Sequence, residues 1–76
     1  MNSLQVDFMT ASTHVTDIRR YTDSDLNKCF KMILSDMVSC GFKCARIHLN
    51  KCGRWVLVGF YNQDGIRGLI DDDLCG

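Results

Sequence analysis

The sequence predicts an α+β fold in which one amphipathic helix packs on a small, mostly antiparallel sheet. Two observations lead to this fold class. Residues 23–40 repeat apolar side chains at helical spacing, whereas shorter runs on either side are typical of strands. The chain has 76 residues and 46% hydrophobic residues, which is enough for one small folded domain that covers residues 1–76. The predicted order of elements is β-α-β-β-β.

The first predicted strand lies at the N-terminus. Leu4, Val6 and Phe8 alternate there with Gln5 and Asp7, as in a strand with one buried face. The pattern of residues 10–20 favours neither helix nor strand.

The predicted helix covers residues 23–40. Thr22 is a suitable N-cap, Asp25 stands at the capping-box position, and Gly41 suits the left-handed residue that ends a helix. Apolar side chains recur at the i, i+3, i+4 and i+7 spacing of an amphipathic helix, at Leu26, Cys29, Phe30, Ile33, Leu34, Met37 and Val38. We expect Leu26, Phe30, Ile33, Leu34 and Met37 to be buried against the sheet, with Lys31 and Ser35 outside.

A β-hairpin follows the helix. Residues 42–49 and 54–61 are rich in β-branched and aromatic residues, and the turn Asn50–Gly53 separates them. A second turn at residues 62–65 leads into a short strand at 66–70, and the tail at 71–76, which includes Asp71–Asp73, is predicted to fray.

The apolar pattern selects one register for this hairpin, because a slip by one residue would exchange the two faces. A turn centred on Lys51 and Cys52 places Asn50 opposite Gly53. The helix-facing layer then pairs Ile47 with Val56, Ala45 with Val58 and Leu49 with Arg54. The far face pairs His48 with Trp55, Arg46 with Leu57 and Cys44 with Gly59.

Both faces of the strand at 54–61 are apolar, as in strands that are buried on two sides. The helix-facing side would carry Val56, Val58 and Phe60, and the far side Trp55, Leu57 and Tyr61. One helix covers only one face, so something else must cover the other. The alternatives are the N-terminal segment with Leu4, Val6 and Phe8, a second copy of the chain, or another protein. Tryptophan, tyrosine and arginine dominate interface hot spots. The predicted partner-binding residues are therefore Trp55, Leu57, Tyr61, Arg46 and His48.

Five cysteines are many for this length. Cys44 and His48 lie four residues apart on a predicted strand, which separates them by about 13 Å at 3.3 Å per residue. A zinc ion needs its ligands within about 2.0–2.3 Å of one point. We therefore expect free thiols, several of them buried, and neither a metal site nor a disulfide framework. Cys52, beside Lys51 in the turn, is the one thiol that we expect to react with thiol reagents.

The sequence holds no catalytic motif. His14 and His48 lie in different segments without a nucleophile at a recognised spacing, and phosphate-binding and dinucleotide-binding motifs are absent. Consecutive acidic residues at Asp71–Asp73 are more typical of a solvated tail than of a cation site. We expect no enzymatic activity, no catalytic residue and no cofactor.

Charge and hydropathy exclude some partners. Lysine and arginine total 9 and aspartate and glutamate also total 9, so no net charge draws the chain to nucleic acid or to an anionic membrane. No apolar run reaches the roughly 20 residues that span a bilayer, and the N-terminus does not have the pattern of a signal peptide. We therefore expect a cytoplasmic protein.

The function predicted from the sequence is binding to a protein, as an inhibitor or modulator of a regulatory protein. The partner is a second copy or a different protein. In its length and its lack of motifs, the chain is similar to small phage or prophage accessory proteins that disable a regulator, a likeness of kind that rests on no shared motif. The alternative is a nucleic-acid-binding regulator, with a basic stripe and with Trp55, Phe60 and Tyr61 available for stacking.

Overall fold

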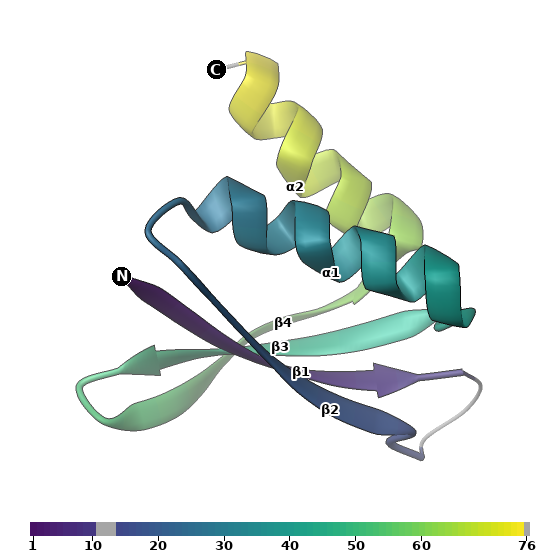
Figure 1. Ribbon diagram of the computed structural model, residues 1–76, viewed down its shortest axis with the longest axis horizontal. Helices are drawn as coiled ribbons and strands as arrows, with labels where there is room; N and C mark the ends of the chain where they lie inside the picture. The colour runs from purple at the N-terminus through teal and green to yellow at the C-terminus, as the bar shows by residue number, and fades with distance from the viewer. Residues whose placement is uncertain (11–13, 76) are drawn as a thin grey trace.

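The computed structural model describes residues 1–10 and 14–75, and the side chains of residues 1–10 and 14–70. Its elements follow one another as β1 (Asn2–Met9), β2 (Asp17–Asp23), α1 (Leu26–Cys40), β3 (Cys44–Lys51), β4 (Arg54–Asn62) and α2 (Gln63–Cys75). The strands form one antiparallel sheet in the order β2-β1-β3-β4. Figure 1 shows both helices on the same side of this twisted sheet. The α+β class is confirmed, but the predicted order of elements is only partly matched.

The core lies between the sheet and the two helices. Leu4, Val6 and Phe8 of β1 are buried and alternate with side chains on the other face, which confirms the predicted N-terminal strand. These three residues face the helices at the centre of the sheet. The alternative in which they fold over the far face is therefore wrong. The core is completed by Tyr21, Cys29, Ile33, Met37, Phe42, Ala45, Ile47, Ile66 and Ile70.

Strand β2 occupies part of the segment for which the sequence favoured neither state. Its pairing with β1 extends from Asp17 opposite Phe8 to Asp23 opposite Asn2. Residues 22 and 23 therefore belong to the sheet, and α1 begins three residues later than predicted. Asp25 is the N-cap in place of Thr22, and its side chain accepts a hydrogen bond from the Asn27 backbone N–H.

The end and the buried face of α1 largely follow the prediction. Gly41 is the C-cap, with the left-handed φ of 74° that glycine adopts without a steric penalty. Ile33 and Met37 are buried, Phe30 and Leu34 pack at the margin of the core, and Lys31 and Ser35 are exposed. The expected burial of Leu26 was wrong, because this residue opens the helix at its first turn and remains exposed.

The predicted strand at 66–70 and the frayed tail are wrong, because residues 66–70 and 71–75 belong to α2; residue 76 lies outside the described residues. The Asn62 side chain accepts a hydrogen bond from the Gly65 backbone N–H at 2.7 Å, as an N-cap does for the third residue of a helix. Ile66 and Ile70 are one helical turn apart and are buried, and Leu69 packs beside them. Gly65 and Gly68 had obscured this helical spacing in the sequence.

The hairpin of β3 and β4 is confirmed, but its register differs from the prediction. The turn is centred on Cys52 and Gly53, whose φ angles of 51° and 79° suit a two-residue hairpin loop. Lys51 lies opposite Arg54 and Leu49 opposite Val56. The ladder shifts between Ile47 and His48, where β4 contains one extra residue, Val58. This bulge changes which β4 side chains share a face.

Candidate functional site

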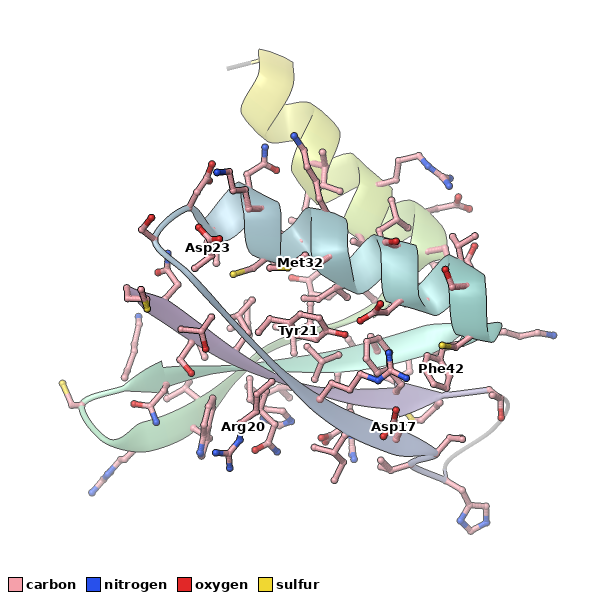
Figure 2. All side chains as sticks on the ribbon, viewed as in Figure 1. Asp17, Arg20, Tyr21, Asp23, Met32 and Phe42 are labelled. Atoms are coloured by element: carbon pink, nitrogen blue, oxygen red, sulfur yellow. The ribbon has the colours of Figure 1, made fainter. Side chains whose placement is uncertain are left out.

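The candidate site is the face of the sheet that points away from both helices, here called the open face. Successive side chains of a strand point to opposite faces of the sheet. The strand registers, together with the buried residues, therefore show which side chains lie on the open face. They include Ile18 and Arg20 of β2, Gln5 and Asp7 of β1, Arg46 and His48 of β3, and Trp55, Leu57 and Phe60 of β4. Figure 2 shows Arg20 on this side, whereas Tyr21 and Phe42 lie between the sheet and α1. No described helix or loop covers the open face (Figure 1).

Apolar side chains are concentrated along β4. Leu57 is 55% exposed and Phe60 is 56% exposed, and Trp55 is exposed to a smaller extent. Ile18, at 58% exposure, adds an apolar side chain at the opposite edge. Scattered exposed hydrophobic residues are normal, but neighbours on one face mark a site of interaction.

A polar cluster occupies the centre of the open face. The Asp7 Oδ2 atom lies 3.2 Å from Arg46 Nη2 and 3.3 Å from His48 Nε2. Asp7 itself is buried, and its Oδ1 atom and the Arg46 Nε atom have no hydrogen-bond partner among the described residues. A buried carboxylate is stable only when it is paired, so the Asp7 carboxylate depends on the guanidinium of Arg46 beside it. The cluster therefore provides a fixed polar centre with apolar side chains around it.

Arg20 crosses the open face toward the far edge of the sheet. Its guanidinium carbon lies 5.5 Å from the centroid of the Trp55 ring, within the range of a cation–π interaction. Among the described residues, none of the ion pairs involves Arg20. Arg20 therefore presents a positive charge that no carboxylate of the described chain neutralises.

The open face holds four of the five residues predicted to bind a partner. Trp55, Leu57, Arg46 and His48 lie on it, although His48 is opposite Leu57 and Arg46 is opposite Phe60, not the predicted neighbours. The predicted placement of Tyr61 was wrong. Beyond the bulge at Val58 the two faces exchange, so Tyr61 lies opposite Ala45 on the helix-facing side and packs against the core. Whether the four residues bind a partner stays a prediction.

The sequence did not predict that Phe60, Ile18 and Arg20 lie on the open face. Phe60 was assigned to the helix-facing layer, because a bulge leaves no signal in the apolar pattern on which the register depended. Ile18 and Arg20 were not placed on this face because β2 was not predicted. Within residues 17–22, Ile18, Arg20 and Thr22 alternate with the helix-facing Arg19 and Tyr21, but charged side chains on both faces hide the period.

A second polar cluster joins β2 to α1 on the opposite side of the sheet. The Tyr21 hydroxyl donates a hydrogen bond to the Asp36 carboxylate, and Arg19 forms ion pairs with Asp17 and Asp36. Burial, together with the Asp36 carboxylate, raises the pKa of the Tyr21 phenol above its usual range. These contacts lie in the seam between sheet and helix, so their role is to hold α1 against β2.

The cysteines occupy three kinds of environment. Among residues with described side chains, Cys29, Cys40, Cys44 and Cys52 are free thiols. Burial raises the pKa of the Cys29 thiol, which lies in the core, whereas Cys52 is exposed in the turn. Cys44 and His48 both lie on β3, so the strand on which the metal-distance argument depends is confirmed. In residues 1–10 and 14–70, histidine, cysteine and aspartate do not gather in a group of three that suits a metal ion.

Neither α1 nor α2, over the part of the chain that the structure describes, is long and apolar enough to cross a membrane. Comparison of the chain with protein-family models, with curated proteins and with solved structures found no match. The open face is therefore interpreted from its own geometry and charge.

Proposed function

We propose that the protein is a small, non-enzymatic binding module that recognises another protein through the open face. One observation carries this proposal. A four-stranded sheet has both helices on one side, and the other side presents Leu57, Phe60 and Trp55 beside Arg20. A partner that covers these side chains removes apolar surface from water, which favours association.

The chemistry of the face defines the surface that complements it. Aromatic and arginine side chains in the middle of an interface contribute most of the binding free energy. Arg20 has no carboxylate partner among the described residues, whereas Asp7 is already paired with Arg46 and His48. The expected partner surface is therefore apolar, with at least one carboxylate placed to meet Arg20.

The role proposed for this binding is to inhibit or modulate a regulatory protein. The chain supplies a recognition surface on a very small scaffold, and a bound module of this size acts by blocking the surface that it covers. The proposed compartment is the cytoplasm, where a reducing environment keeps thiols such as Cys40 and Cys52 free.

Single-stranded nucleic acid is the alternative ligand for a sheet with exposed aromatic side chains. The charges at the centre of the open face disfavour nucleic acid, because the Asp7 carboxylate lies there and Arg46 is already paired with Asp7. A backbone of phosphates needs several free cations along its path. We therefore favour a protein partner and treat nucleic acid as an outcome of the test.

The test is affinity capture of the tagged protein's partner from the organism that encodes it, followed by binding measurements with the purified partner. Arg20→Glu and Trp55→Ala each remove one member of the open face. Val38→Lys is the control, because Val38 is exposed at 57% on α1, away from the sheet face. We expect both open-face variants to weaken binding at least about tenfold, or 1.4 kcal/mol, and the control to bind as wild type does.

Two outcomes would contradict the proposal. Binding that disappears after nuclease treatment, and that weakens steeply between about 50 and 200 mM salt, would assign the face to nucleic acid. Binding to a protein that Val38→Lys removes, and that the open-face variants leave unchanged, would move the interface to α1.

A further inference from the structure

The two outer strands of the sheet differ in how they are protected from pairing with another strand. Exposed sheet edges are commonly protected by charged side chains or by proline. Strand β2 carries Asp17, Arg19, Arg20 and Asp23 along its seven residues. Strand β4 has neither a charge nor a proline from Trp55 to Asn62, and its one irregularity is the bulge at Val58. The edge of β4 is therefore open to another strand that can match this bulge.

Apolar side chains are exposed on both faces of β4. Val56 is 47% exposed on the helix-facing side, opposite Leu49, whereas Leu57 and Phe60 are exposed on the open face. A partner lying flat on the open face would leave Val56 in water. A strand beside the edge of β4 would contact side chains on both faces at once.

A second copy of β4 matches this edge in one particular register. Two antiparallel strands related by a twofold axis perpendicular to the sheet must place side chains of the same face opposite each other. The extra residue Val58 exchanges the faces of β4 beyond it. Side chains of the same face therefore lie opposite each other when the twofold axis passes between Val58 and Gly59. Leu57 then lies opposite Phe60 of the second copy, and Val56 opposite Tyr61 of the second copy. The first pair lies on the open face and the second on the helix-facing side, and each pair brings apolar side chains together.

Charge does not oppose this register. Between Trp55 and Asn62 the two strands carry no charged side chain, so no like charges meet along the paired segment. Asp64, just beyond the strand in α2, already pairs with Arg67 at 3.0 Å.

We propose that two copies of the chain associate through antiparallel pairing of their β4 strands, which produces one continuous eight-stranded sheet. The twofold axis places both open faces on the same side, with Leu57 and Phe60 of each copy in one apolar cluster at the centre. The pairing uses the edge of the sheet and does not depend on the proposed function. A protein that binds the open face would meet a surface of twice the extent.

The test measures mass against concentration for the purified full chain by sedimentation velocity, from about 1 μM to 1 mM, which spans moderate and weak affinities. A reductant is present throughout, so that disulfides cannot join the copies. Leu57→Lys and Phe60→Lys each place a charge in the proposed interface. Ile18→Lys is the matched control, since Ile18 is equally exposed on the same face but at the other edge. We expect a dimer that either β4 variant weakens at least tenfold and that Ile18→Lys leaves unchanged.

Hydrogen exchange on the wild-type protein gives a second readout that needs no variant. The amides of β4 should gain protection as concentration rises, whereas those of β2 should not. A monomer at every concentration would overturn the proposal. A dimer that Ile18→Lys disperses, or one in which β2 and not β4 gains protection, would also overturn it. Arg20→Glu removes the contact with Trp55 but none of the proposed pairs between the two β4 strands, so we expect it to leave the dimer intact, and the failure of one proposal is distinguishable from the failure of the other.

Discussion

The Arg20 guanidinium lies over the Trp55 ring, although β2 and β4 are the two outer strands of the sheet. The strong twist of the sheet and the length of both side chains bring them within 5.5 Å above the central strands. The contact links the two edges of the open face, so it orders the side chains that we propose to bind a partner.

This contact predicts a measurable coupling between the two residues. In a double-mutant cycle of Arg20→Ala and Trp55→Ala, we expect the two losses of unfolding free energy to differ from additivity by about 0.5–1 kcal/mol, the range for an exposed cation–π pair. Chemical denaturation measures it. A parallel cycle of Arg54→Ala with Trp55→Ala should be additive, and a coupling of the same size in both cycles would contradict the specific contact.

The helix should depend on Ile33 for its attachment to the sheet. Ile33 is fully buried, so Ile33→Ala should lower the free energy of unfolding by about 2–5 kcal/mol through lost burial and the cavity that remains. Val38→Ala, on the exposed side of the same helix, should change it by less than about 0.5 kcal/mol. Equal effects at the two positions would mean that α1 is oriented differently.

Tyr21 should make the protein sensitive to alkaline pH. Its pKa is raised in the folded protein, so the neutral phenol is favoured by folding and its contribution is fully present below the ordinary tyrosine pKa of about 10. That contribution is lost as pH rises above this value. We expect Tyr21→Phe to cost about 1–3 kcal/mol at neutral pH, with a flatter decline of stability above pH 10. Denaturation at several pH values measures both, and a decline as steep in Tyr21→Phe as in the wild type would contradict this role of Tyr21.

The hairpin turn should be improved by one substitution. Cys52 has a φ of 51°, a left-handed conformation that is unfavourable for a residue with a Cβ atom and that asparagine tolerates better. Asn-Gly is the preferred pair for such a turn, so Cys52→Asn should raise the free energy of unfolding by about 0.5–1 kcal/mol. Lys51→Asn, inside β3, should bring no gain. A loss of stability in Cys52→Asn would argue against this turn.

The positions of Cys44 and His48 on β3 predict that the protein binds no zinc, which elemental analysis can check. Cys44 and His48 are four residues apart on a strand, about 13 Å at 3.3 Å per residue, which no single metal ion bridges. Purified protein should carry no stoichiometric zinc, and added reductant should leave its melting curve unchanged. One equivalent of zinc that survives dialysis would require a different path for the chain through residues 44–48.

The sequence by itself determined the elements whose pattern is local and strong. The spacing of Cys29, Ile33 and Met37 identified α1, Gly41 marked its end, and alternation at Leu4, Val6 and Phe8 identified β1. The two runs around Asn50–Gly53 indicated the hairpin. Each of these signals depends on side-chain periodicity or backbone preference within a few residues, so it is independent of the rest of the fold.

Tertiary structure alone decided which side chains share the candidate site. The extra residue at Val58 exchanges the faces of β4, so that Phe60 is exposed on the open face and Tyr61 packs toward the helices. The segment after Asn62 became α2 because Ile66 and Ile70 could bury themselves against α1 and the sheet. Strand β2, with charges on both faces, exists because β1 supplies its hydrogen bonds. In each case the deciding contact joins residues distant in sequence, and local pattern carries no information about such contacts.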